Sequence, residues 1–409
     1  MSSVSEATTQ FCLDFFKVVD KDFSSQNIVF SPPSITTALG MVLLGAGGNT
    51  ATQIKKVLHL SEFAENENPG TGSSLEATRS RPSPPHQLVP DEQCDIPGGI
   101  HSQFHDIILE INSPTASYEL AVANRLYGEK TFQFLEQYLY CLQKLYQAEL
   151  KSADFKNARE ETREQINLWV ESFTNGKIKN LFAPDTLSVD TVLVLVNAVY
   201  FKGKWAVEFE KERTTESPFW INETTSKPVQ MMHRKGKYNI ASIKEHDCQV
   251  LELPYKNCEL SMYIVLPREY TGLTQLEKEL TNDKLTTWIS PDYMETDKLD
   301  VFLPRFKIET TAQLTQYLKD LGMTDLFSSY SDLSGIAEQG DLFVSEAVHK
   351  AYIEVNEEGT EATAATGITV DVTSLGSQFV ADHPFLFFIR HQKTKCILFY
   401  GRVSSPENL

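Results

Sequence analysis

The chain has 409 residues, with 37 Lys and Arg against 55 Asp and Glu, which gives a formal net charge of −18. Its composition, 41% hydrophobic and 22% charged, is typical of a soluble globular protein, and the acidic balance argues against nucleic acid as the main partner. No stretch approaches the roughly 18 apolar residues of a membrane helix, and no apolar run follows a charged start as in a secretory signal. We therefore expect no membrane association and a cytoplasmic protein, with non-classical release to the extracellular space as an alternative.

One early segment, residues 64–99, differs from the rest of the chain. It contains no Phe, Tyr or Trp and holds six of the 18 prolines. Such a segment buries too little apolar area to offset the entropy lost on ordering. We predict a mobile surface loop that interrupts a single domain spanning residues 1–409.

Helical patterns come first along the chain, and strand patterns dominate later. Residues 104–111 and 166–173 place apolar side chains at i, i+3, i+4 and i+7, and Gly176 is a plausible stop for the second helix. Residues 191–201 read as a strand buried on both faces, and residues 260–266, 299–303 and 397–400 are further strands. This order predicts an α+β protein rather than a βαβ alternation.

The residues with metal-binding or redox chemistry form no strong motif. His101 and His105 are spaced i, i+4, but two histidines alone make a weak site, so we expect no metal and no cofactor. The six cysteines contain no CxxC and are expected to be free thiols in a reducing compartment. They are Cys12, Cys94, Cys141, Cys248, Cys258 and Cys396.

A strand-like pattern near the C-terminus is flanked by polar residues. From Thr360 on, one alternate set is uncharged and ends in Ile368, Val370 and Val372, while the other set carries both charges. This period of two is typical of a strand with one buried face. The segment could be exposed in one state and inserted into a sheet in another, or it could be an ordinary edge strand followed by a loop.

Five motifs make the chain resemble a known family. They are NIVFSPPS at 27–34, VNAVYFKGKW at 196–205, LPRF at 303–306, VHKAYIEVNEEGTEATAAT at 348–366, and ADHPFLFFIRH with LFYGR within 381–402. Together they resemble the serpins, specifically the intracellular ovalbumin-type (clade B) branch, over the whole chain except residues 64–99. The resemblance implies an α+β serpin fold with three β-sheets, a large central sheet A, about nine helices and an exposed reactive-centre loop at residues 357–378.

The resemblance also implies a monomeric protease inhibitor that acts as a suicide substrate. A protease cleaves the loop and forms an acyl-enzyme, and the freed strand then inserts into sheet A and distorts the protease. A dozen new ladder hydrogen bonds at roughly 1 kcal/mol each would supply on the order of 10 kcal/mol. Burial of Ile368, Val370 and Val372 would add about 1.5–3 kcal/mol each, so insertion is comparable to the whole stability of a domain.

Counting along the family pattern from Gly359 implies a reactive bond at Thr373–Ser374. No Lys or Arg lies between Lys350 and Arg390, so a trypsin-like protease has nothing to bind. Thr373 is small and suits an elastase-like serine protease, whereas a papain-like cysteine protease would read Val372. Cleavage after Asp371 by a granzyme B-like or caspase-like protease is a third alternative, although that bond would shorten the inserting strand.

The family pattern also assigns supporting residues. Pro33 and Thr363 depart from it, since relatives usually have a larger apolar residue and an Ala there. The implied shutter cluster is Ser31, Ser34, Asn197 and His349, and the implied breach, where insertion begins, is Trp205, Arg305 and Glu357. The implied hinge is Gly359, Thr360, Glu361, Ala362, Thr363, Ala364, Ala365 and Thr366.

The buried Ser and His residues do not predict an enzyme, because Ser-His catalysis needs an exposed nucleophile and none lies in a G-x-S-x-G elbow. The rival to inhibition is a non-inhibitory serpin that is cleaved as a substrate or serves as an interaction or storage protein. Pro33, next to the shutter cluster, is the residue that favours this rival.

Overall fold

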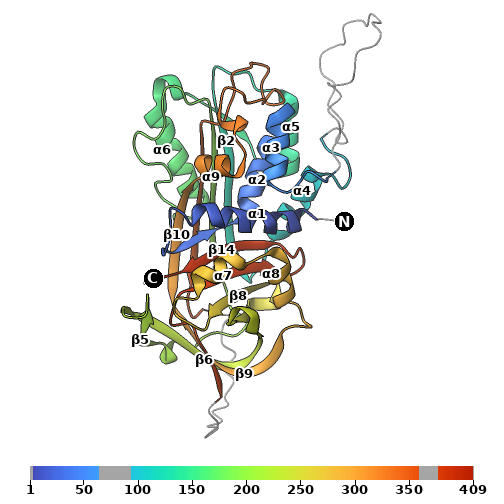
Figure 1. Cartoon of the computed structure of the whole chain (residues 1–409). Coiled ribbons are helices and arrows are strands. Elements are labelled where there is room, and N and C mark those ends of the chain that lie inside the picture. Colours follow the sequence, from blue (N-terminus) through green and yellow to red (C-terminus); the bar gives the residue numbers. More distant parts are fainter. Residues whose placement is uncertain (1–2, 64–93, 359–375, 409) are drawn as a thin grey trace, which may run out of the picture.

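The computed structural model describes residues 3–63, 94–358 and 376–408 (Figure 1). These residues form nine α-helices and two hydrogen-bonded sheets, which confirms the predicted α+β serpin fold. The helices are α1 (Val4–Val19), α2 (Pro32–Leu43), α3 (Gly48–Val57), α4 (Ile100–Ile111), α5 (Glu136–Tyr146), α6 (Phe155–Phe173), α7 (Leu273–Glu279), α8 (Asn282–Trp288) and α9 (Leu314–Leu321).

The smaller sheet has five strands in the order β10-β11-β4-β2-β3. It lies between α6 on one side and α2, α3 and α5 on the other (Figure 1). Apolar residues therefore cover both of its faces, which is why β4 reads as a continuous hydrophobic run. Its strands are β2 (Tyr118–Glu129), β3 (Leu150–Ala153), β4 (Leu193–Gly203), β10 (Phe306–Gln313) and β11 (Glu346–Val355).

The larger sheet has nine strands, and its path runs β1-β14-β13-β8-β7-β6-β9-β12 with β5 paired to β6. It joins two of the three predicted sheets, because the long β6 pairs with β5 and β9 over most of its length and with β7 only at its end. Its strands are β1 (Ile28–Phe30), β5 (Thr215–Trp220), β6 (Ser226–Ile243), β7 (Cys248–Pro254), β8 (Leu260–Pro267), β9 (Glu295–Pro304), β12 (Ser377–Val380), β13 (Phe385–His391) and β14 (Ile397–Val403).

The predicted helices and strands are confirmed, with shifts of a few residues at their ends except for the start of α6. Helix α6 begins at Phe155, eleven residues before the periodic stretch, because the Asp154 side chain accepts a hydrogen bond from the backbone of Asn157 and caps the helix. It ends near Gly176, whose φ of +77° is the left-handed conformation that glycine tolerates and whose N–H donates to the carbonyl of Glu171.

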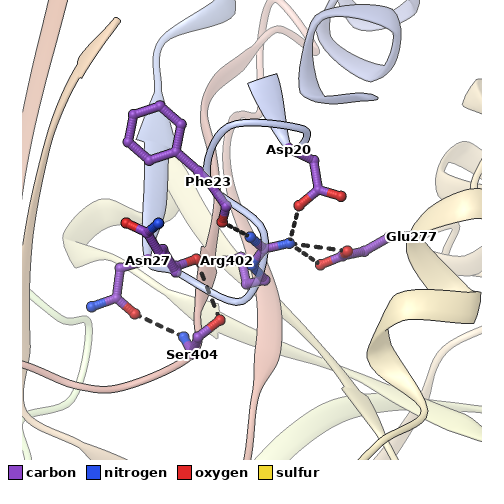
Figure 2. A network of polar contacts seen from close by, with 7 residues as sticks. Asp20, Phe23, Asn27, Glu277, Arg402 and Ser404 are labelled. Carbon is purple, nitrogen blue, oxygen red and sulfur yellow. Dashed lines mark hydrogen bonds and ion pairs between the residues drawn. The ribbon is translucent and has the colours of Figure 1, made fainter. Parts of the chain in front are cut away.

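A buried charged network holds β14 against the N-terminal part of the chain (Figure 2). The Arg402 guanidinium donates to Asp20, to both carboxylate oxygens of Glu277 and to the carbonyl of Phe23, at distances from 2.6 to 3.1 Å. Burial raises the pKa of Glu277 to about 7, although Arg402 opposes this shift. The LFYGR motif thus supplies a structural anchor.

The expectation that all cysteines are free is wrong for two of them. Cys94 and Cys141 form a disulfide between the segment before α4 and helix α5, whereas Cys12, Cys248, Cys258 and Cys396 are free. The two partners are 47 residues apart in sequence, and the packing of α4 against α5 brings them together. Residue spacing alone could not show this proximity.

Within the described part of the chain, no helix combines the length and apolarity that crossing a membrane requires.

Candidate functional site

The central feature of the five-stranded sheet is a seam between β4 and β11. These strands are parallel and directly hydrogen-bonded over nine residue pairs, from Glu346 opposite Val194 to Glu354 opposite Lys202. Their other neighbours, β2 and β10, are antiparallel to them. A further strand placed in the seam could therefore run antiparallel to both of its neighbours.

The chain leaves β11 at the end of this seam and re-enters the described structure at Gly376, beside the larger sheet. There β12 pairs in parallel with β9, with Ser377 opposite Leu299. The predicted hinge residues 359–366, the predicted bond Thr373–Ser374 and the subsite residues Asp371 and Val372 fall between these points, outside the described residues.

The predicted shutter residues lie together on the α2 side of the seam. His349 on β11 and Asn197 on β4 are opposite each other in the register, and the two side chains share a hydrogen bond. Asn197 Nδ2 donates to Ser34 Oγ at 2.6 Å, and the backbone N–H of Ser31 donates to His349 Nε2 at 3.2 Å. The cluster thus ties both seam strands to the start of α2.

The hydrogen bonds of His349 fix its protonation state. Since Nε2 accepts from Ser31, the ring proton lies on Nδ1 and points to the Asn197 oxygen. His349 is fully buried, and this burial lowers its pKa to about 3. The imidazole is therefore neutral at physiological pH, and charging it would break the bond from Ser31.

Pro33 lies beside this cluster, at the second position of α2. With Ser31 and Ser34 it lines a cavity of about 210 Å³. The resemblance predicts a larger apolar residue here, so Pro33 places less apolar volume beside this cavity than the family pattern predicts.

The predicted breach residues converge on Glu357, just beyond β11. Its carboxylate is buried and accepts from Arg305 Nη2 and from Thr214 Oγ1, both at 2.7 Å. Burial alone would raise the pKa of Glu357, but the hydrogen bonds from Thr214 and Arg305 outweigh it and the pKa is lowered. The carboxylate is thus held ionised between Arg305, just before β10, and Thr214, just before β5 of the larger sheet.

Trp205 adds contacts to the same residues just beyond β11, and we call these contacts and those of Glu357 the anchor at the end of β11. Its indole Nε1 donates to the carbonyl of Asn356 at 2.8 Å, its ring stacks on Tyr255 at 4.5 Å, and its backbone N–H donates to the carbonyl of Glu358. Residues 356–358 are therefore fixed immediately before the segment that contains the predicted hinge.

Sequence reasoning missed three contributors around the seam. Thr214 is the second donor to Glu357, and Lys202 on β4 pairs with Glu358 at 2.9 Å. On the α6 side, Tyr200 and Tyr352 are opposite each other in the register, with ring centroids 5.4 Å apart. Lys202, Tyr200 and Tyr352 lie within the family motifs at 196–205 and 348–366, so the sequence offered a signal for them, whereas Thr214 lies outside every motif.

The histidines considered as a metal pair have protein partners. His101 Nδ1 contacts the hydroxyl of Tyr146, and His105 Nδ1 lies 3.0 Å from the carbonyl of Leu145. No group of three or more potential metal ligands occurs within residues 3–63, 94–358 and 376–408.

Comparison with known proteins gives matches over nearly the whole chain. The family model described as "Serpin (serine protease inhibitor)" matches residues 6–406. Serpin B4 of Homo sapiens is 47% identical over 409 residues, and leukocyte elastase inhibitor of Sus scrofa is 45% identical over 412 residues. Each alignment covers 99% of this chain and 100% of the relative.

Solved structures agree with the fold. Uncleaved ovalbumin matches with a TM-score of 0.88 at 39% identity, covering 99% of this chain and 100% of the other. A loop-inserted structure of a cleaved ovalbumin mutant, with the same coverage, matches with a TM-score of 0.84 at 38% identity. The direct pairing of β4 with β11 agrees with the higher similarity to the uncleaved form.

Proposed function

The chain belongs to the serpin family, and from this premise we propose that it inhibits proteases as a suicide substrate. The protease nucleophile would attack the carbonyl carbon of Thr373, the peptide bond to Ser374 would break, and Ser374 would leave as a new amino terminus. The protease would remain acylated by Thr373 while the freed segment inserts between β4 and β11. The protein itself would not turn over substrate as an enzyme does.

The observation that carries this proposal is the parallel seam at the base of the loop. A segment that leaves β11 and folds back would run antiparallel to β11 and to β4. Insertion would replace the one row of hydrogen bonds between β4 and β11 with two rows, one from the inserted strand to each neighbour. The sheet would thus gain about one row of hydrogen bonds, and the apolar alternate set from residue 360 to 372 would be buried. Insertion of a reactive loop into this sheet is the established serpin transition.

We assign two devices to this transition. The contacts of Glu357 and Trp205 would hold the start of the loop in the uncleaved state and fix where insertion begins. The cluster of His349, Asn197 and Ser34 would hold the seam closed further along and must rearrange when β4 and β11 separate. Both roles rest on the contacts described above.

The target proposed first is an elastase-like serine protease that reads Thr373. A papain-like cysteine protease that reads Val372 is the alternative, followed by cleavage after Asp371. The sequence around Val372 most resembles epipin within the clade B branch, with bomapin-like and yukopin-like features elsewhere, and this finer placement is likewise a proposal.

The test combines the protein with neutrophil elastase and with cathepsin L, and measures residual protease activity, adducts on denaturing gels and the cleaved bond by mass spectrometry. An adduct with elastase and a cut at Thr373–Ser374 would support the serine-protease reading. Loss of cathepsin L activity with that same cut would favour a cysteine protease.

A matched pair of variants tests the insertion step. Thr360 belongs to the alternate set that would be buried, and Thr363 belongs to the outward set. Thr360→Arg should convert the inhibitor into a cleaved substrate, because an unpaired charge would be buried. Thr363→Arg adds the same charge to the other face and should still inhibit. If both variants trap the protease equally, the proposed insertion is wrong.

The second candidate, a non-inhibitory serpin, is favoured by Pro33 and the cavity beside the shutter cluster. It predicts clean cleavage by both proteases without loss of protease activity. In that outcome Pro33→Leu, which restores a larger apolar residue at this position, shows whether Pro33 is responsible.

A further inference from the structure

Three exposed lysines lie on one face of the larger sheet, and we call them the lysine face. Lys237 on β6 is directly opposite Lys298 on β9, and Lys235 is two residues from Lys237 on the same face of β6. All three side chains are exposed, and none makes an ion pair or side-chain hydrogen bond within the described residues. The chain as a whole has a net charge of −18, so this face is a local exception.

Within the described residues, the nearby acidic groups make no ion pair with the three lysine side chains. Asp300, opposite Lys235, is held at 2.8 Å by His233. Asp297 accepts a hydrogen bond from the backbone of Lys298, and Glu252 on β7 is bonded to Asn239. Each carboxylate keeps its negative charge but is oriented by another group, so it reduces the positive potential of the lysine face without pairing with a lysine ammonium.

The facing lysines reduce the stability of the isolated protein. Like charges directly opposite each other on adjacent strands destabilise a sheet, and Lys237 and Lys298 form such a pair. An anionic surface that docks on both lysines would remove this repulsion. The face therefore has the charge pattern of an interaction surface.

The position of the lysine face connects it to the reactive loop. Ser377 on β12 is opposite Leu299, so the register places Gly376 at the level of Lys298. A Cβ atom at Gly376 would lie 3.6 Å from the Asp300 carboxylate. The proposed reactive bond is only two residues before Gly376, which an extended chain spans in roughly 7 Å. A protease bound at Thr373–Ser374 would thus lie close to this part of β6 and β9.

We propose that the lysine face is a docking surface for an acidic patch on the target protease, next to its substrate cleft. This inference rests on the proposed function, because it assumes that a protease attacks the loop. The lysines would select among proteases that accept the same loop sequence. Long-range attraction would speed encounter, while the loop residues would still decide which bond is cut.

The measured quantity is the second-order rate constant for attack on the loop, whether attack ends in a trapped adduct or in cleaved protein. The probes are two elastase-like and two papain-like proteases, one of each pair with net negative and one with net positive charge. Each is assayed at low and at high salt. This rate constant tests docking even if the trapping step proposed above fails.

The test variant is K235E/K237E/K298E. The control is K21E/K151E/K156E, which changes the net charge equally at exposed lysines far from the loop in sequence and in other elements. We expect the test variant to slow attack by the acidic proteases at least tenfold at low salt, with the effect shrinking at high salt. The control variant should change the rate less than twofold, and both variants should melt near the parent.

Equal rate constants for the two variants with every protease, or no attack on the loop by any of them, would overturn the docking proposal. A rate difference that occurs only when heparin or single-stranded DNA is added would overturn it in favour of a polyanion site. Trapping that is retained while attack by acidic proteases is slowed would support both proposals. Cleavage without trapping but with the same rate loss would support docking alone.

Discussion

At the scale of single residues, His349 couples the closed seam to pH. The unfolded state binds a proton near pH 6.5, whereas the folded protein resists protonation down to about pH 3. The contribution of the neutral ring is therefore fully present above pH 6.5 and is lost as the pH falls below it. The loss is about 1.4 kcal/mol per pH unit, or ~2 kcal/mol between pH 6.5 and 5.

This coupling predicts the behaviour of His349→Gln, whose side chain cannot titrate. The variant should be less stable than the parent at pH 7, and the difference in unfolding free energy should shrink by about 2 kcal/mol by pH 5. Urea unfolding of both proteins at half-unit pH intervals measures this. Parallel profiles would show that His349 is not the titrating group.

Glu277 should have the opposite effect on stability to His349, because its contribution to the unfolding free energy decreases as the pH rises. Its folded pKa of about 7 lies above the ordinary value of 4.5, so its contribution is fully present below pH 4.5 and is lost as the pH rises through 7. Relative to Glu277→Gln, the parent should lose on the order of 3 kcal/mol of unfolding free energy between pH 4.5 and 7. Urea unfolding of both proteins over that range measures this loss. If the parent instead gained stability relative to Glu277→Gln as the pH rises, the prediction would be wrong.

At the scale of elements, the anchor at the end of β11 is the site where separate parts of the chain meet. Arg305 follows β9, Thr214 precedes β5, and both donate to the one buried carboxylate of Glu357. Because the carboxylate is buried and satisfied, removing one donor leaves a buried charge with fewer partners, which costs more than breaking an exposed pair.

A double-mutant cycle on Arg305→Met and Glu357→Gln should therefore give a coupling energy of about 1–3 kcal/mol in the unfolding free energy. The matched control is the cycle on Lys202→Met and Glu358→Gln. The Glu358 side chain is 46% exposed against 4% for Glu357, so this coupling should stay below about 1 kcal/mol. Both cycles are measured by urea unfolding. Equal coupling in the two cycles would show that the buried pair is no stronger than the surface pair.

The same anchor shows what the sequence could and could not predict. Periodicity located α4, α6, β4 and β8, because those elements bury one regular set of residues. The pairing of Arg305 with Glu357 could be proposed only from the family pattern, since 52 residues separate them. Tyr200 and Tyr352 lie in family motifs and Thr214 does not, but the sequence could not show which partners these residues meet, because such contacts arise only once the chain has folded.

At the scale of the whole molecule, the disulfide links the segment before α4 to α5. It closes a loop with a sequence separation of 47 residues, and such a bond typically stabilises by ~2–4 kcal/mol. Cys94→Ser with Cys141→Ser should lower the unfolding free energy by that amount, and reductant should do the same to the parent. Cys258→Ser, at an exposed free cysteine, is the control and should have no effect.

Peptide mapping without reductant decides whether this bond forms in the expressing cell. A bond found in protein from an oxidising compartment and absent from cytoplasmic protein would fit the redox rule for disulfides. A variant that lacks both cysteines and unfolds like the parent under oxidising conditions would contradict the stabilisation.

The last prediction concerns the stability of the uncleaved state as a whole. The β4–β11 seam satisfies its own ladder, yet a segment with a matching alternate pattern begins just beyond β11. If that segment enters the seam once it is cut, the sheet gains a strand and buries three β-branched side chains, and the gain of on the order of 10 kcal/mol must appear as heat resistance. Nicked protein should therefore melt on the order of 10 °C above intact protein in calorimetry, since each kcal/mol is worth about 2–4 °C in a domain of 150–250 residues and roughly 1 °C in a chain of 409 residues. The nicked Thr360→Arg variant should lose most of this rise and nicked Thr363→Arg should keep it, which separates insertion from simple relief of loop strain. Equal melting of nicked and intact protein would mean that the seam stays closed and that this serpin does not trap.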